Sequence, residues 1–142
     1  MVACRWENMV RLSPEFPRRV VHQLLEYGNR VALVNAVPYL PGNASREGMR
    51  NGSRPPFFEP PGKKNGRESA NAVIAALAED RVAIVDASKL FDNKNDEVLC
   101  LDARGRFLYH DSGHLSGYGA AELFGDFVSL LSASPVVHAS PN

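Results

Sequence analysis

The sequence predicts an α/β domain built around a parallel sheet. Two segments with helical periodicity, 14–28 and 68–80, are each followed by a short valine-rich apolar run, at 30–38 and 82–87. Strands of a parallel sheet are covered on both faces, so they read as continuous apolar runs rather than as alternating ones. A repeated order of helix and then buried strand is typical of α/β proteins. We therefore expect the two strands to run parallel.

Length and composition describe one ordinary globular domain. The chain has 142 residues, which is enough to bury a core, and 44% of them are hydrophobic while 23% are charged. Sixteen basic residues balance sixteen acidic ones, so the overall charge does not indicate a nucleic-acid partner. No apolar run is long enough to span a bilayer, and residues 1–12 lack the apolar stretch of a secretory signal.

The first predicted helix, 14–28, has clear boundary signals. Ser13 is expected to act as its N-cap, with Pro14 at the first helical position and Gly28 as the C-terminal stop. Five apolar residues lie on one face at helical spacing: Phe16, Val20, Val21, Leu24 and Leu25.

Residues 39–67 are expected to form a long loop insertion. The segment holds half of the prolines and many of the glycines, mixed with basic residues. Loops of this length on compact domains are often either functional or mobile, and both interpretations stay open here. Phe57 and Phe58 either anchor this loop or line a pocket.

The C-terminal part of the chain is predicted to contain short strands and a closing helix. A polar segment at 88–106 includes the short apolar run 98–101, and 107–110 reads as a short strand. An apolar face at helical spacing then predicts a helix over 120–131. Residues 1–135 are expected to form the domain, and 136–142 a tail.

The segment between the last predicted strand and the last predicted helix, HDSGHLSG (110–117), is the candidate catalytic loop. Sites in open α/β sheets lie in loops that follow the C-terminal ends of strands. Asp111 and His114 are three residues apart, so the carboxylate can accept the imidazole Nδ1–H if the loop forms a single turn. That bond fixes the tautomer and leaves Nε2 as a general base. Three glycines would give the backbone the freedom to present both side chains on one side: Gly113, Gly117 and Gly119.

Other interpretations of this loop stay open. Asp111 or Ser112 could simply start the last helix, leaving His114 as an exposed loop histidine, and Ser116 is expected to cap that helix. A metal site made of His110, Asp111 and His114 is disfavoured, because alternation along a strand would turn His110 and Asp111 to opposite faces. We therefore expect no metal, and we read His110 as a strand-end residue.

The longer string LYHDSGHLSGYGAAEL closely resembles the last conserved block of SGNH-type hydrolase domains. It is most similar to the version fused to acyltransferase-3 type membrane O-acyltransferases, which modify bacterial surface polysaccharides. The matching positions are Tyr109, Asp111, His114, Leu115, Ser116, Gly119 and Ala120. Three earlier segments resemble the same domain in the same order: VACRWENM with Trp6, VALVNAVPYLPG and VAIVDASKLF. The resemblance covers almost the whole chain, with its specificity concentrated in 107–120.

The resemblance implies a three-layer α/β/α, flavodoxin-like fold with a parallel sheet, here without its first strands. It implies that His114 is the catalytic base and Asp111 its orienting partner in attack of a serine on an ester carbonyl. The implied function is acyl-ester hydrolysis or O-acyl transfer linked to O-acetylation of bacterial cell-surface polysaccharide, without a cofactor. The implied partners are an acyl-ester or glycan substrate and a parent membrane acyltransferase domain, and the implied location is the periplasmic face of the inner membrane.

Two features depart from the pattern of that domain. The nucleophilic serine belongs to a Gly-Asp-Ser block, and no such block occurs in the 142 residues. We therefore expect this polypeptide alone to lack esterase and acyl-transfer activity, and the alternative function is an inactive SGNH-like binding module or a truncated fragment. The resemblance also implies a pair of cysteines before the last block. Cys100 occupies the later of these two positions, and the earlier position has no cysteine in this sequence. Pairing of Cys100 with Cys4 stays open, and a single buried thiol is the expected state.

Overall fold

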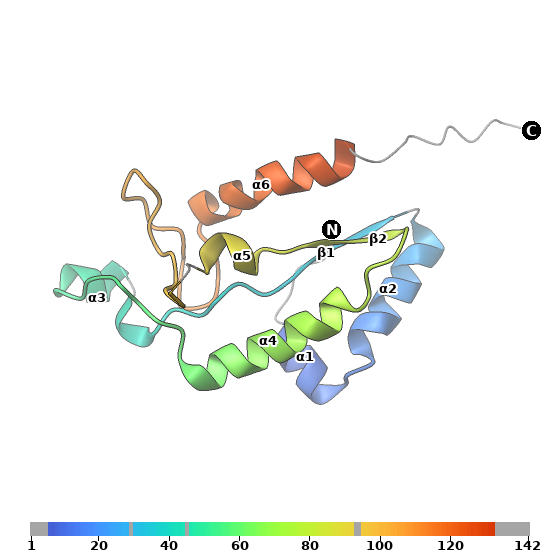
Figure 1. Ribbon diagram of the computed structural model, residues 1–142, viewed down its shortest axis with the longest axis horizontal. Coiled ribbons are helices and arrows are strands. Elements are labelled where there is room, and N and C mark those ends of the chain that lie inside the picture. The colour runs from blue at the N-terminus through green and yellow to red at the C-terminus, as the bar shows by residue number, and fades with distance from the viewer. Residues whose placement is uncertain (1–5, 29, 45, 93–94, 133–142) are drawn as a thin grey trace, which may run out of the picture.

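The computed structural model describes residues 6–28, 30–44, 46–92 and 95–132 (Figure 1). The elements follow one another as α1 (Trp6–Leu12), α2 (Phe16–Tyr27), β1 (Val31–Val34), the 3-10 helix η1 (Gly42–Ala44), α3 (Arg46–Arg50), α4 (Pro61–Ala75), β2 (Val82–Val85), α5 (Ser88–Phe91) and α6 (Gly117–Ser132). Residues 1–5 and the predicted tail, 136–142, lie outside the described residues, and Trp6 begins helix α1.

The predicted parallel sheet is confirmed. β1 pairs with β2 in parallel, with Val31 opposite Val82 and Val34 opposite Val85. Helices α1, α2 and α4 lie on one side of the strand pair and α6 lies on the other (Figure 1). The arrangement is therefore a mixed α/β fold in three layers, and it places the chain segments that follow β1 and β2 at the same end of the sheet.

The core is divided by the sheet. On the side of α1, α2 and α4 it is centred on Trp6, which is fully buried. The Trp6 indole N–H donates to the carbonyl of Val34 at 2.8 Å, so α1 is attached to the last residue of β1. A further apolar cluster lies beneath the segments that follow the strands, around Phe91, Leu108 and Tyr109. This second cluster supports the candidate catalytic loop.

The predicted boundaries of the first helix are confirmed only at its C-terminal end. Gly28 ends α2 as predicted, and its N–H donates to the carbonyl of Leu24 at 2.8 Å. The prediction that Ser13 is the N-cap is wrong, because α2 begins at Phe16 and its cap position is Glu15. The Ser13 hydroxyl accepts a hydrogen bond from the Arg19 guanidinium at 3.4 Å, and the cap position of α2 makes no side-chain capping bond.

The predicted loop at 39–67 contains more regular structure than expected. It includes η1 and α3, and α4 begins at Pro61 rather than at residue 68. The early turns of α4 were missed because their buried face includes Arg67, a charged residue that breaks the apolar pattern. Phe57 is 5% exposed and anchors the loop in the core, whereas Phe58 is 52% exposed.

The C-terminal segments form isolated bridges rather than full strands. Leu101 pairs with Phe107 and Tyr109 pairs with Leu115, in both cases antiparallel. The predicted strand at 107–110 is therefore a pairing at single positions, and α6 begins at Gly117, before the predicted start. Among the described residues, no helix is both long enough and apolar enough to cross a membrane.

Candidate active site

The loop that carries Asp111 and His114 connects the bridged segment around Tyr109 to α6. Three backbone hydrogen bonds fix it. The His110 N–H donates to the carbonyl of His114 at 2.7 Å, and the Ser116 N–H donates to Leu108 at 2.9 Å. The N–H of Leu40, from the segment that follows β1, donates to the Ser112 carbonyl at 2.8 Å. The loop is thus a closed turn attached to the end of the sheet.

Asp111 and His114 make the contact that their spacing predicted. Asp111 Oδ2 lies 2.7 Å from His114 Nδ1. Asp111 Oδ1 accepts the backbone N–H of Gly113 at 2.8 Å and that of His114 at 2.9 Å. These bonds, that of the Gly113 N–H first, lower the pKa of Asp111 to about 2. The aspartate is therefore ionised at neutral pH, which places the imidazole proton on Nδ1 and directs basicity to Nε2.

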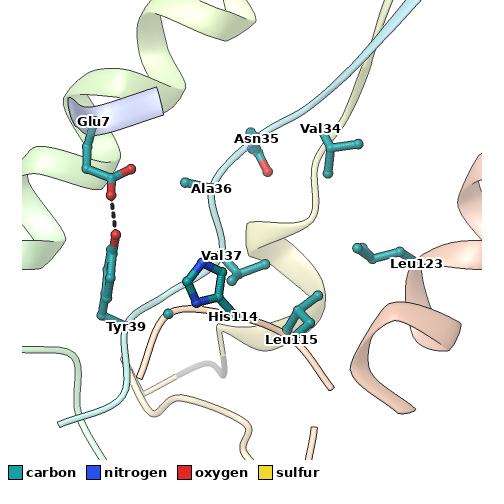
Figure 2. A pocket seen from close by; sticks show the side chains of 10 residues that line it. Glu7, Val34, Asn35, Ala36, Val37, Tyr39, His114, Leu115 and Leu123 are labelled. Carbon is teal, nitrogen blue, oxygen red and sulfur yellow. Dashed lines mark hydrogen bonds between the residues drawn. The ribbon is translucent and has the colours of Figure 1, made fainter. Parts of the chain in front are cut away.

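His114 lines a pocket of about 310 Å³ (Figure 2). The pocket lies between the residues that follow β1, the start of α1 and the loop before α6. Its walls are formed by Glu7, Val34, Asn35, Ala36, Val37, Tyr39, Gly113, His114, Leu115 and Leu123. One side is polar and the other apolar, and the volume is at the lower end of the range of small-molecule sites, about 300–1,000 Å³. The pocket suits a small group with one polar and one apolar end.

Glu7 and Tyr39 form the wall opposite His114. The Tyr39 hydroxyl donates to Glu7 Oε1 (Figure 2). Glu7 Oε2 is buried and has no hydrogen-bond partner among the described residues. Because an unpaired buried carboxylate oxygen is costly, Glu7 Oε2 lowers the stability of this wall.

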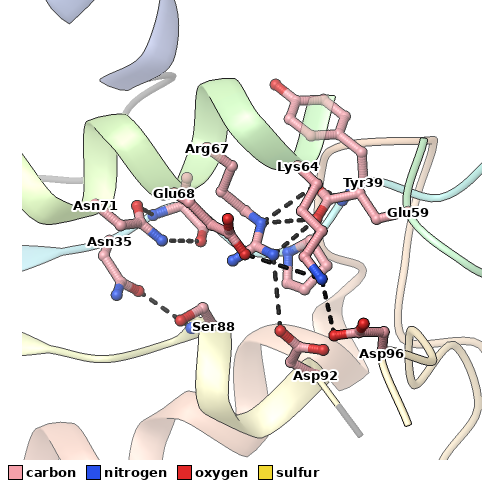
Figure 3. Close-up of polar contacts among 12 residues, drawn as sticks. Asn35, Tyr39, Glu59, Lys64, Arg67, Glu68, Asn71, Ser88, Asp92 and Asp96 are labelled. Carbon is pink, nitrogen blue, oxygen red and sulfur yellow. Dashed lines mark hydrogen bonds and ion pairs between the residues drawn. The ribbon is translucent and has the colours of Figure 1, made fainter. Parts of the chain in front are cut away.

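A buried ion pair supports this wall from behind (Figure 3). Arg67 of α4 donates from Nε and from a terminal nitrogen to Glu59 Oε2, at 2.9 Å and 2.7 Å. Both side chains are nearly fully buried, with 4% and 3% exposure. Glu59 Oε1 also accepts the N–H of Tyr39 at 2.8 Å. Since Leu40 bonds to Ser112, the pair fixes the backbone that holds the candidate catalytic loop.

Ser116 caps α6 as predicted. Its hydroxyl accepts the N–H of Gly119 at 3.2 Å and donates to the carbonyl of Phe107 at 2.7 Å. The expected role of the loop glycines needs correction, because no left-handed backbone conformation occurs at Gly113, Gly117 or Gly119. A Cβ at Gly119 would lie 2.1 Å from the carbonyl oxygen of Leu108. Close packing, not conformational freedom, therefore requires glycine at that position.

The remaining candidate residues are His110 and the two cysteines. His110 is exposed and does not line the pocket. Within the described ranges, no group of three or more histidine, cysteine, aspartate or glutamate side chains could hold a metal ion. Cys100 is a buried free thiol whose pKa is raised by burial, and Cys4 lies outside the described residues.

Comparison with protein families identifies the fold that carries this site. The family described as the SGNH domain fused to AT3 domains matches residues 2–129. The chain belongs to this SGNH family. Its members are domains of the hydrolase or acyltransferase type, and the two parallel strands with their covering helices are a partial SGNH fold. No curated protein and no solved structure gives a significant match.

Sequence reasoning found one side of the SGNH pocket and missed the other. Asp111 and His114 lie in a short segment with a recognisable pattern, and the structure brings them together. Glu7, Asn35 and Tyr39 come from segments that are distant in sequence, and only the packing of α1 against β1 brings them to His114. The one available signal was Asn35, a polar residue inside the otherwise apolar predicted run 30–38. The catalytic roles of Asp111 and His114 stay predictions.

Proposed function

We propose that this SGNH domain carries the base and the orienting acid of a serine-type acyl-transfer site that acts on ester groups of bacterial cell-surface polysaccharide. The observation that carries the proposal is the 2.7 Å contact between Asp111 Oδ2 and His114 Nδ1 at the edge of a pocket of about 310 Å³. An ionised carboxylate on Nδ1 gives the imidazole the orientation and tautomer that a general base needs.

In the proposed reaction, His114 Nε2 takes the proton from a serine hydroxyl as its oxygen attacks the ester carbonyl. The new C–O bond gives a tetrahedral intermediate. The imidazolium, stabilised by Asp111, then returns the proton to the departing atom of the acyl donor as the bond to the acyl group breaks, leaving an acyl-serine. Water or an acceptor hydroxyl attacks that intermediate in the second half, with His114 again acting as the base.

The serine is not supplied by a Gly-Asp-Ser block within these 142 residues. We propose that it belongs to a chain segment other than the present one, and that a membrane acyltransferase domain of the AT3 type provides the acyl group. The family description, which names fusion to AT3 domains, supports this partner. Acetyl is the proposed acyl group, in keeping with the small pocket beside His114.

The test supplies the missing serine. The N-terminal segment of a catalytically active SGNH domain, including its Gly-Asp-Ser block, is joined ahead of residue 1, and hydrolysis of 4-nitrophenyl acetate is measured. We expect turnover in the chimera that is lost in His114→Ala and reduced by a factor of about 10⁴ in Asp111→Asn, where the tautomer is wrong. The matched control is His110→Ala, which removes an imidazole next to the site and should leave turnover intact. Turnover that survives His114→Ala would refute the proposal.

A second candidate function is an SGNH-like binding module without catalysis. The observation that favours it is again the missing Gly-Asp-Ser block. In that case the chimera folds but shows no turnover that depends on His114, whereas the 142-residue chain still binds a glycan.

A further inference from the structure

A second concave site, the arginine groove, lies apart from the pocket of His114 and has a volume of about 540 Å³. Its charged and aromatic lining residues are Arg46, Arg50, Arg54, Arg106, Phe107 and Tyr118. No aspartate or glutamate is among the described residues that line it. The chain as a whole has equal numbers of acidic and basic residues, so this positive charge is a local concentration.

The arginines of the groove come from separate segments. Arg46 and Arg50 are the first and last residues of α3, and their i,i+4 spacing puts them on one face of this short helix. Arg54 follows in the next loop and Arg106 belongs to the bridged segment at 101–107. Like charges at i,i+4 spacing destabilise a helix. Their convergence on one groove therefore costs stability in the absence of an anion.

Three of these arginines lack an acidic partner in the part of the chain that the structure describes. None of Arg46, Arg50 and Arg54 forms an ion pair within 4.0 Å. Arg106 is the exception, because its Nε donates to Asp102 Oδ2 at 2.6 Å. Most of the positive charge in the groove is thus available to a ligand.

Two of the guanidinium groups are held in position. Arg54 donates from one terminal nitrogen to the carbonyls of Met49 and Ser53, at 2.7 Å and 2.8 Å. The guanidinium carbon of Arg106, Cζ, lies over the Tyr118 ring, 4.4 Å from its centre. Side chains that are already ordered lose less entropy when a ligand binds. The planar guanidinium also forms paired hydrogen bonds with carboxylate and phosphate groups.

We propose that the arginine groove binds an anionic glycan whose sugars carry carboxylate or phosphate groups. The Tyr118 ring is 45% exposed, and the part that Arg106 does not cover gives the groove an apolar surface for the C–H face of a sugar. Its volume is within the range of small-molecule sites, about 300–1,000 Å³, and fits a short stretch of sugars.

The groove and the His114 pocket share one chain segment, 107–118. Phe107 and Tyr118 line the groove, whereas His114 and Leu115 line the pocket. Both sites are therefore built on the segment that carries the proposed base, and we extend the proposal to make the glycan in the groove the substrate of that base. This extension, in which the glycan in the groove is the substrate, rests on the proposed function, while binding of an anionic glycan to the groove does not.

Calorimetric titration of the 142-residue chain tests the proposal. The probes are a short oligogalacturonate, which carries carboxylates, a phosphorylated oligomannose, and a neutral galacto-oligosaccharide of equal length. We expect at least one anionic probe to bind and the neutral probe to bind at least about tenfold more weakly, because hydrogen bonds to charged groups are stronger. Comparing the two anionic probes distinguishes carboxylate from phosphate recognition.

The variant Arg50→Ala/Arg54→Ala should weaken binding of the anionic probe by about tenfold or more. The matched control, Arg18→Ala/Arg19→Ala, removes the same charge from α2 and should leave affinity nearly unchanged. His114→Ala should also bind normally, so a failure of the proposed catalysis is distinguishable from a failure of the groove. Equal binding of neutral and anionic probes, no binding, or equal losses in both double variants overturns the proposal. Tighter binding of single-stranded DNA or of phosphatidylglycerol vesicles overturns the glycan assignment.

Discussion

The ring of Tyr39 lies directly against the α-carbon of Gly113, the residue before His114. A methyl group on Gly113 would be 2.6 Å from Tyr39 Cε1 and 3.1 Å from Cδ1. The ring cannot easily give way, because its hydroxyl bonds to Glu7 and its backbone N–H bonds to Glu59. The wall and the loop of the pocket are therefore packed together at a position that only glycine fits.

Gly113→Ala is expected to lower the free energy of unfolding by about 1–3 kcal/mol, the usual cost of overpacking. Urea unfolding followed by circular dichroism measures this change, and the NMR signals of His114 should shift. Gly117→Ala is the matched control, since a Cβ there meets nothing within 4 Å. In the first turn of α6 it should stabilise the protein by about 0.4–1 kcal/mol. Equal effects of the two substitutions would contradict the close packing at Gly113.

Arg67→Met is expected to cost about 3–5 kcal/mol of unfolding free energy, because it leaves the Glu59 carboxylate buried without its cation. Amide hydrogen exchange should also speed up at Leu40, whose N–H holds the candidate catalytic loop. The control is Arg18→Met, which breaks an ion pair with Glu15 whose side chains are 73% and 74% exposed. That pair contributes only about 0–1 kcal/mol. An Arg67→Met protein as stable as the wild type would show that the pair does not support the wall.

The low pKa of Asp111 predicts a specific acid sensitivity. The carboxyl has a pKa of about 2 in the folded chain, below the value of about 3.9 in an unfolded one. A lowered folded-state pKa contributes stability that is fully present above about pH 4 and is lost as the pH falls toward 2. Asp111→Asn should remove that part of the pH dependence and leave the remainder. A carbon-13 NMR titration of the Asp111 carboxyl checks the value, and a midpoint near 3.9 would contradict it.

Ser116→Ala is expected to destabilise the protein by about 0.5–2 kcal/mol, because the first turn of α6 loses its cap. The carbonyl of Phe107 also loses its donor. Ser129→Ala is the control within the same helix, since among the described residues the Ser129 hydroxyl bonds only to the Gly125 carbonyl one turn back. Alanine is the better helix former there, so the control should be neutral or slightly stabilising. Thermal unfolding of both variants makes the comparison.

The parts of the fold that sequence predicts well are those with local signals. Helix α2 was predicted because its apolar residues recur at helical spacing, and the two strands were predicted because each is a short, continuous valine-rich run. The early turns of α4 were not predicted, since Arg67 occupies a buried position and its partner Glu59 is not recognisable as such from sequence. A buried charge that is neutralised by a specific partner outside its own helix cannot be distinguished, by its sequence pattern, from a solvent-exposed charge.

The candidate site divides in the same way. Asp111 and His114 are three residues apart, and a single turn brings them together, so spacing alone predicts their contact. The Glu7–Tyr39 wall depends on how α1 packs against the sheet, and the arginine groove depends on how α3 meets the bridged segment at 101–107. Neither arrangement can be predicted from the local spacing of apolar residues in the sequence.

The attachment of Trp6 to Val34 gives the protein an intrinsic fluorescent reporter. Trp6 is the only tryptophan of the chain, and its indole is fully buried and bonded to the end of β1. Val34 and the residue after Trp6, Glu7, both line the pocket of His114. Emission from this single indole should therefore be blue-shifted while α1 is packed and should move to longer wavelength when α1 separates from the strand. A spectroscopist can thus follow assembly of the pocket wall without adding a label.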